Sequence, residues 1–354
     1  MEFETKRKSQ LYSSKDEQII FLSLKLTIVP FEHLYIIGNG FDLHHQIKST
    51  YKDFNDWLIR NGYIDVTNKI DEIFGCNDIW WMDFEKSLGD VNLSYYARQK
   101  AMENQPNFAS DDFRDADWYD AEICIENEMT ELISFLKDTF SEWIDSLNAP
   151  NKLKVIPLLK KDSFFINFNY TDTLESLYRV SPHNIWHPHG YVRDLGAEYI
   201  IGHGKSRDIL EKEMEKQEPQ PPKNATEEEL SDFYQQTTDF VIERAKDETI
   251  FEFSKLQKPV VEIIESQSNL WGMIHNVQNV YIYGYSFSEI DEPYLNKIIQ
   301  SVNLQKVQWE ISVYSESDKK RVVDFIQKHN LPKTNIHIVK LSELMCTYQL
   351  SLPI

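Results

Sequence analysis

The segment from Leu34 to Leu43 constrains the fold of this chain more than any other stretch of its 354 residues. An apolar run ends abruptly at Gly38-Asn39-Gly40, and a helix-like pattern follows. This is how a buried strand enters a helix in α/β proteins, and glycine lets main-chain N–H groups approach a phosphate there. The third glycine of a dinucleotide fingerprint is missing, so on its own the motif is more often only a tight turn.

Further apolar runs of strand length alternate with amphipathic segments along the chain. Strands are expected at about 33–37, 163–169, 184–186, 199–201, 280–283, 308–314 and 335–339. Longer helices are expected at about 126–147, 289–302 and 318–329, with others beginning at Ser49 and Asp172. This alternation predicts an α/β fold with a doubly wound, mostly parallel, Rossmann-like sheet. Ligands of such sheets bind outside the carboxyl ends of the strands.

Two segments interrupt the alternation and suggest how the chain is organised. Residues 1–30 are expected to be an N-terminal extension, and residues 31–354 a single α/β domain. We expect helical insertions at about 50–150, which is rich in aromatic and acidic residues, and at about 205–275, which is highly charged. In the second insertion, Thr226-x-x-Glu229 has the pattern of a capping box that starts a helix.

The composition excludes several classes of function. A formal net charge of −20 repels the phosphate backbone, which argues against broad nucleic-acid binding but allows a local basic pocket. The three cysteines are scattered and form no Cys-x-x-Cys pair, so neither a zinc ribbon nor a disulfide framework is expected. This pattern fits a reducing, cytoplasmic location. No apolar run approaches the roughly twenty residues that cross a bilayer, so no membrane partner is expected.

Polar residues follow several of the expected strands. The clusters are Gly38 to Asp42, Asn169-Tyr170-Thr171-Asp172, His187-Pro188-His189-Gly190 with Gly202-His203-Gly204, and Gly284-Tyr285-Ser286. Each one has a plainer explanation, since Asp172 is a good N-cap and glycines allow sharp reversals. Independent turns have no reason to be so rich in histidine and asparagine, however. If the sheet is parallel, the clusters can converge on one crevice, and together they predict a ligand site.

The motifs resemble those of a known family. The run Ile37-Gly38-Asn39-Gly40-Phe41-Asp42-Leu43, with Thr50-Tyr51-x-Asp53-Phe54, looks like the opening of the AbiH family of bacterial phage-abortive-infection proteins. The similarity continues in Asp83-Phe84-Glu85, Phe168-Asn169-Tyr170-Thr171, the His187 and Gly202 clusters, and Tyr283-Gly284-Tyr285-Ser286 with Asp291. It covers about residues 33–300. The resemblance implies phage defence and says much less about chemistry.

The order of the motifs is also similar, more distantly, to that of sirtuin-like NAD-binding domains. That resemblance implies NAD as substrate or ligand and hydrolysis of its nicotinamide–ribose bond, with Asn169 and His189 as catalytic residues. Asn169 would hold a water or a ribose hydroxyl, and His189 would accept a proton. Thr171 stands where sirtuins carry an aspartate, which puts NAD itself in question. The absence of four zinc cysteines argues against a protein deacylase.

The residues expected to bind the nucleotide are Gly38, Asn39, Gly40, Phe41, Asp42, Thr171, Asp172, Gly284, Ser286 and Asp291. The glycine turn would hold the pyrophosphate through its backbone N–H groups. The charge of Asp42 is unfavourable close to phosphates, so we expect it to orient the loop or to receive a ribose hydroxyl. A small nucleotide and a phage-derived trigger are the expected partners, and we also expect a homo-oligomer.

Two alternatives to an NAD hydrolase remain open. The first is a nucleotide-sensing module that has the same pocket and no turnover. The second is a metal-dependent hydrolase or nuclease that uses His187, His189 and His203, with His44 or His45 as a possible fourth ligand. This pattern is less constrained than a true zinc motif, and no metal is expected. The net charge of −20 also disfavours a nuclease.

Overall fold

The computed structural model describes residues 31–75, 78–107, 109, 111–192, 199–237 and 239–345. A six-stranded sheet, parallel throughout, has the strand order β3-β2-β1-β4-β5-β6. Its strands are β1 (His33–Ile37), β2 (Phe164–Asn167), β3 (Ile185–Trp186), β4 (Asn279–Tyr283), β5 (Gln308–Ser312) and β6 (Ile336–Val339). The predicted α/β fold with a parallel, Rossmann-like sheet is therefore confirmed. The expected N-terminal extension, residues 1–30, lies outside the described residues.

The centre of the sheet is the point where the strand order reverses. β1 pairs with β2 on one side and with β4 on the other, and the later strands continue outward from β4. In doubly wound sheets this reversal opens a crevice at the carboxyl ends of the two central strands. The fold therefore places the residues after β1, β2 and β4 at one edge.

Both faces of the sheet are covered by helices, which explains why the central strands β1 and β2 are almost entirely apolar and buried. Leu34 and Ile36 of β1 face α13 (Val260–Ser266), α14 (Ser268–Met273), α15 (Glu292–Ser301) and α16 (Glu316–Lys328). Tyr35 and Ile37 face the opposite way, toward α2 (Asn39–His44) and α9 (Thr173–Ser176). We call these layers, with the sheet, the sheet part.

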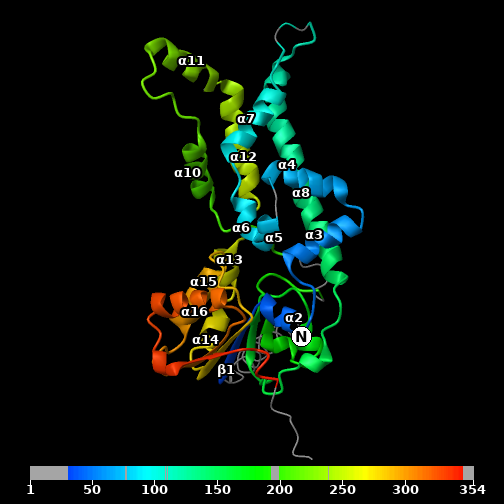
Figure 1. Ribbon diagram of the computed structural model, residues 1–354, viewed down its shortest axis with the longest axis vertical. Helices are drawn as coiled ribbons and strands as arrows, with labels where there is room; N and C mark the ends of the chain where they lie inside the picture. Colours follow the sequence, from blue (N-terminus) through cyan, green and yellow to red (C-terminus); the bar gives the residue numbers. More distant parts are fainter. Residues whose placement is uncertain are drawn as a thin grey trace, which may run out of the picture.

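The remaining helices form a second body, which we call the helical part. Its first segment contains α3 (Tyr51–Arg60), α4 (Ile64–Phe74), α5 (Asp78–Met82), α6 (Phe84–Gly89), α7 (Leu93–Glu103) and α8 (Asp120–Asp145). Its second contains α10 (Arg207–Gln217), α11 (Glu227–Thr237) and α12 (Phe240–Ser254). Figure 1 shows the helical part as a tall column above the sheet part. Because α12 packs against α7 and α8, the column is built from two distant stretches of chain.

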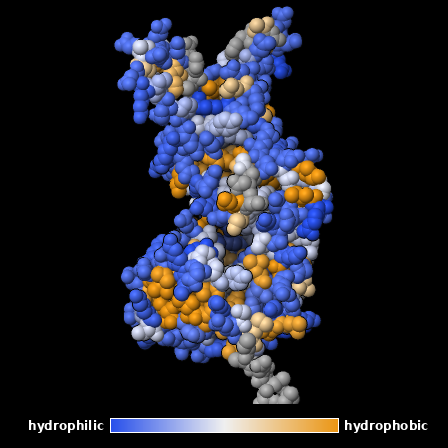
Figure 2. Space-filling model, in the orientation of Figure 1, coloured by the Kyte–Doolittle hydropathy of each residue, from blue (hydrophilic) through white to orange (hydrophobic). Residues whose placement is uncertain are grey.

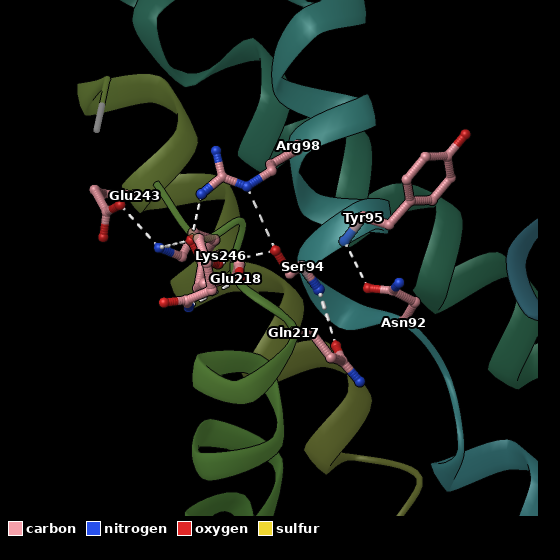
Figure 3. Close-up of polar contacts among 9 residues, drawn as sticks. Asn92, Ser94, Tyr95, Arg98, Gln217, Glu218, Glu243 and Lys246 are labelled. Carbon is pink, nitrogen blue, oxygen red and sulfur yellow. Dashed lines mark hydrogen bonds and ion pairs between the residues drawn. The ribbon is translucent and has the colours of Figure 1, made fainter. Parts of the chain in front are cut away.

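The helical part combines an aromatic core with polar ties between its helices. Its core includes Phe54, Phe84, Phe140 and Phe253, all fully buried. Figure 3 shows one polar tie, in which Arg98 and Ser94 of α7 contact Glu218, the residue that ends α10. Lys246 of α12 lies 3.3 Å from the carboxylate of Glu218, so one acidic residue joins three helices.

Several boundaries differ from those expected. Residues 199–201 form no strand, because the N–H of Ile200 donates to the carbonyl of His189 and the chain runs on as a loop. The long helix expected at 126–147 begins earlier, at Asp120, where the 3₁₀ turn η1 (Asp115–Tyr119) leads into it. The second helical segment ends at Ser254, since α13 and α14 pack on the sheet instead.

The predicted capping box at the start of α11 is confirmed. The N–H of Thr226 donates to Glu229 Oε2 at 2.8 Å, and the N–H of Glu229 donates to Thr226 Oγ1 at 3.2 Å. Figure 2 shows a mainly hydrophilic surface on this face, with apolar residues gathered over the region of α14–α16. Within the described part of the chain, every helix is too short or too polar to cross a bilayer.

Candidate functional site

A cavity of about 130 Å³ lies where the carboxyl ends of β1, β2 and β4 face the helical part. The sheet part contributes loop residues and the helical part contributes aromatic side chains and one carboxylate. The lining residues are Gly38, Asn39, Asp42, Ser49, Tyr51, Glu85, Phe140, Trp143, Ile144, Leu147, Phe168, Asn169, Tyr170, Thr171, His189, Lys258, Tyr285, Ser286 and Asp291. Polar groups thus converge in an aromatic-walled hollow at the strand ends, where α/β folds bind ligands.

The structure brings most of the predicted site residues to this cavity. Those that line it are Gly38, Asn39, Asp42, Asn169, Thr171, His189, Ser286 and Asp291. Those that do not are Gly40, Phe41, Asp172 and Gly284. Asp172 is the N-cap of α9 and Phe41 is buried against the sheet, so both have structural positions.

The glycine turn after β1 is used for close packing. The N–H groups of Gly38 and Gly40 donate to the carbonyls of Tyr283 and Gly284, and that of Phe41 donates to Gly38. A Cβ atom on Gly38 would lie 2.7 Å from the Cα of Tyr285, and one on Gly40 would lie 2.8 Å from the Cα of Gly284. Glycine is needed here because two turns touch, and these three amides are already engaged. The expected backbone cradle for a pyrophosphate is therefore not formed by them.

Asp42 organises the loop after β2. Its carboxylate accepts hydrogen bonds from Thr171 Oγ1 at 2.5 Å and from Thr173 Oγ1 at 2.8 Å. Burial raises the pKa of Asp42 to about 6, and hydrogen bonds from Thr171, Thr173 and Asn169 oppose that rise. Asp42 thus fixes the loop that follows β2, and of the two roles expected for it, orienting a loop and receiving a ribose hydroxyl, the structure shows the first. Thr171 acts as a partner of Asp42 and only its outer surface lines the cavity.

Asn169 is buried just beyond the end of β2. Its main-chain N–H donates to Asn167 Oδ1 at 3.2 Å, and its side chain hydrogen-bonds with Asp42. Only 5% of the residue is exposed, yet it lines the cavity. The side chain is therefore held in one orientation at the cavity wall.

His189 is buried in the wall of the same cavity. Its Nε2 atom lies 3.5 Å from Asp291 Oδ1, and neither of these two buried atoms has a hydrogen-bond partner. Burial, and then the positive charge of Lys258, hold the pKa of His189 well below its usual range. The imidazole is therefore neutral, and its conjugate acid is too strong for it to be an effective proton acceptor at neutral pH.

A buried cation, Lys258, lies between two carboxylates of the cavity wall. Its Nζ atom is 2.7 Å from Glu85 Oε1 and 3.7 Å from Asp291 Oδ1. Burial raises the pKa of Glu85 and of Asp291, and Lys258 opposes both shifts. For Lys258, burial acts to lower the pKa, but the two carboxylates outweigh it and the pKa is raised. The ammonium is therefore charged and neutralises one of the two acids.

Lys258 is held by a loop contact that gives the Gly202-His203 motif its role. The N–H of His203 donates to the carbonyl of Leu256, and the N–H of Lys258 donates to the carbonyl of His203, both at 2.9 Å. Gly202 has a φ of +155°, and a Cβ atom there would lie 2.0 Å from the carbonyl oxygen of Leu256. The Gly202-His203 motif thus fixes the backbone of residues 256–258 through main-chain hydrogen bonds, and so positions Lys258.

The histidines of the metal alternative do not meet. His187 pairs with Glu175 at 3.0 Å, His203 Nε2 contacts a main-chain carbonyl of α12, and His189 faces Asp291. The other two histidines considered contact main-chain carbonyls as well, namely His44 and His45. Across the described residues, no three His, Cys, Asp or Glu side chains are arranged to hold a metal ion. The described residues therefore do not support the three-histidine alternative.

Comparison with known proteins agrees with the motif resemblance. A family model described as Bacteriophage abortive infection AbiH matches residues 34–313, which include every residue that lines the cavity. No curated protein and no solved structure matches the chain. Since the family model covers most of its length, the chain belongs to the AbiH family of bacteriophage abortive infection proteins.

Proposed function

We propose that this AbiH protein contributes to abortive infection by hydrolysing the nicotinamide–ribose bond of NAD in the cavity at the strand ends. The observation that carries the proposal is that Asn169, from the end of β2, and His189, from the loop after β3, line one cavity beside Gly38. Strand ends far apart in sequence supply the two predicted catalytic residues together with Asp291. Such convergence of fixed polar groups is what an active site requires and what packing alone does not explain.

The size of the cavity supports a ring as the buried part of the ligand. An apolar cavity of roughly 150 Å³ in another protein holds benzene, so about 130 Å³ admits one six-membered ring and excludes a whole dinucleotide. A larger groove of about 660 Å³ shares Ser286 with the cavity. The groove is lined by both basic and acidic side chains, and two of its basic residues, Arg321 and Lys328, are paired with carboxylates. It therefore offers room, but no net positive charge, for the part of the dinucleotide that the cavity cannot hold.

The charge of the cavity supports a cationic ring. Three carboxylates, those of Asp42, Glu85 and Asp291, line it beside a single ammonium, that of Lys258. Its walls also include several aromatic side chains, whose faces attract cations. The nicotinamide of NAD is a pyridinium cation, whereas purines are neutral and phosphates are anionic. The same negative field also stabilises the positive charge that develops on the ribose as the bond breaks.

The proposed reaction follows from this arrangement. The C–N bond breaks with its electron pair passing to the ring nitrogen, which leaves neutral nicotinamide and an oxocarbenium-like ribose. A water molecule then adds to the ribose carbon and loses one proton. Asn169 can hold that water or a ribose hydroxyl without adding charge, because Asp42 fixes the side chain. Products are ADP-ribose, nicotinamide and a proton.

The test is nicotinamide release from NAD by the purified protein, and NAD content in phage-infected cells that express it. Asn169→Ala is expected to lower the rate on the order of 100-fold, as loss of a positioned polar group does in other active sites. The matched control is Asn279→Ala, at the opposite end of the sheet, which should keep the activity. An unchanged NAD pool in protected cells, with Asn169→Ala still protective, would contradict the proposal.

A second candidate is a nucleotide sensor without turnover. One observation favours it, namely that the side chain of Asn169, the proposed water-holding residue, already hydrogen-bonds with Asp42. This candidate predicts that the purified protein retains an intact nucleotide in stoichiometric amount. Mass spectrometry of the protein before and after hours of incubation with NAD separates the two candidates.

A further inference from the structure

We propose that Glu85, which the helical part contributes, is the catalytic carboxylate that accepts the proton of the attacking water, with Lys258 and Asp291 as positioning residues. The inference rests on the proposed hydrolysis and changes the identity of its proton acceptor. It also gives the helical part a direct place in the chemistry, although that part contributes no strand to the sheet.

The position of Glu85 is the first support. It lies in the first turn of α6, its side chain is 13% exposed, and it lines the cavity together with the strand-end residues. Its carboxylate is 2.7 Å from Lys258 Nζ and is hydrogen-bonded by Tyr51. A carboxylate held by a cation and a phenol, with one side toward a cavity, is fixed in orientation and still reaches a ligand there.

The second support is the contrast between Glu85 and His189. Lys258 and burial both disfavour a protonated imidazole, so His189 has little capacity to take a proton from water. At Glu85, by contrast, burial raises the pKa and the neighbouring Asp291 adds to the rise, so that the net shift is upward although Lys258 opposes it. The carboxylate is therefore the better base of the two at neutral pH. His189 remains a neutral polar group at the cavity wall.

The third support is that the two acids and the ammonium of this cluster together carry one negative charge, so the cluster can bind one additional proton. His189 Nε2 and Asp291 Oδ1 lie 3.5 Å apart without a hydrogen bond, and Asp291 Oδ1 lies 3.7 Å from Lys258 Nζ. The titratable groups that face Glu85 come from five elements or loops: Tyr51, Tyr170, Lys258, Tyr285, Asp291 and Tyr294. Two acids and one ammonium leave one negative charge, which can accept the proton.

The step balances without any further reactant. The C–N bond of the N-glycoside breaks, and its electron pair neutralises the cationic leaving base. The water oxygen forms the new C–O bond, and its proton passes to the carboxylate of Glu85. The protonated acid then releases the proton to solvent, which restores the starting state.

The experiment compares wild type with Glu85→Gln, Glu85→Asp and Lys258→Met in three assays: NAD binding by calorimetry, single-turnover nicotinamide release across pH, and phage protection in cells. Glu85→Gln should bind NAD within about tenfold of wild type, because Asp42 and Asp291 still line the cavity, and should release nicotinamide at least about 100-fold more slowly, as removal of a general base does. Glu85→Asp keeps a carboxylate on a side chain that is one methylene shorter, and its rate of nicotinamide release should lie between those of wild type and Glu85→Gln. The matched control is Glu252→Gln, a fully buried glutamate of α12 outside the cavity, which should behave as wild type.

The pH profile distinguishes catalysis from mere structural support. Wild-type rates should fall at low pH as Glu85 becomes protonated. Lys258→Met removes the cation that lowers the pKa of Glu85, so the fall should move to higher pH. The assignment would be overturned if the rate of Lys258→Met fell at the same low pH as that of the wild type. It would also be overturned if Glu85→Gln released nicotinamide within threefold of the wild-type rate.

Failure of the parent proposal has a different signature. If the wild type releases no nicotinamide, NAD is not the substrate, and the assignment of Glu85 is then decided by phage protection in cells. Folded Glu85→Gln protein that no longer protects, beside a protective Glu252→Gln control, supports an essential carboxylate at this site. Full protection by Glu85→Gln would refute it. Thermal unfolding of each variant establishes that it is folded.

Discussion

The sheet part and the helical part meet at the cavity but hold their residues there by different means. In the sheet part, main-chain contacts position the site, as where the amide of Gly40 donates to the carbonyl of Gly284 at 2.8 Å. In the helical part, side-chain contacts do so, as where Glu85 is hydrogen-bonded by Tyr51 and pairs with Lys258 of the link to the sheet part. Farther from the cavity, an ion pair between Arg98 and Glu218 joins helices of the same part. The backbone of the sheet part thus shapes one side of the cavity, and the helical part adds aromatic side chains and one carboxylate, that of Glu85.

This difference implies different sensitivities. Main-chain contacts between two turns tolerate no added atom, whereas ion pairs respond to pH and salt. The sheet part should therefore fail on small steric changes, and the helical part should weaken gradually as charges are removed or screened.

The largest expected effect separates two glycines, one in each part. Gly284 has a φ of +64°, and an added Cβ atom would lie 2.0 Å from the nitrogen of Phe41. Gly75 ends α4 at a φ of +61°, and an added Cβ atom there meets nothing within 4 Å. Gly284→Ala should lower the free energy of unfolding by more than about 4 kcal/mol, and Gly75→Ala by about 1–2 kcal/mol. Urea unfolding measures both values, and equal losses would mean that close packing of the turns is unimportant.

The next effect concerns a buried acid of the sheet part. The pKa of Asp42 is about 6 when folded against an ordinary 3.8, so the folded state binds the proton more tightly. This contribution to stability is complete below pH 3.8 and is lost as pH rises through about 6. Between pH 4 and 7 the wild type should lose on the order of 3 kcal/mol of unfolding free energy relative to Asp42→Asn.

An exposed acid of the helical part provides the comparison for Asp42. Glu131 of α8 has a side chain that is 76% exposed and pairs with Lys69. Glu131→Gln should leave the pH dependence of unfolding close to that of the wild type. If the free energy of unfolding of Asp42→Asn varies with pH as that of the wild type does, the folded state does not bind a proton at Asp42 more tightly than the unfolded state.

The smallest effect tests the polar tie of Figure 3. Arg98 has a side chain that is 15% exposed and contacts Glu218, whose side chain is 22% exposed. Arg98→Ala should cost about 1 kcal/mol at low salt, and less in 1 M NaCl because salt screens partly exposed pairs. Arg207→Ala removes a more exposed pair with Glu211 and should cost less than about 0.5 kcal/mol. Unfolding at both salt concentrations checks the order; equal costs would contradict it.

The two parts also differ in how much their sequence reveals. The central strands were predictable because they are apolar on both faces and end at turn residues, and the parallel order then places Asn169, His189 and Ser286 at one edge. The segment 199–201 has a similar apolar run, but its main chain pairs with the loop at His189 and not with a strand. The sequence of a short apolar run does not indicate whether its backbone will hydrogen-bond with a strand or with a loop.

Lys258 could not be predicted, because its burial depends on contacts remote in sequence. It stands in the short link between α12 and α13, where a lysine is ordinarily solvent-exposed. Its position follows from the His203 contact and from Glu85, more than 150 residues earlier in the chain. The role of Gly38 and Gly40 was missed for the same reason, since the turn that touches them begins at Gly284.

The strand order also determines when this cavity can exist during synthesis. β1 is among the first elements to leave the ribosome, yet its neighbour β4 begins at Asn279, and Asp291 follows later still. Glu85 likewise emerges long before Lys258, its partner. A nascent chain therefore carries no complete site until Asp291 has been added and β4 has paired with β1. Under the proposed function, an unfinished chain therefore cannot hydrolyse NAD.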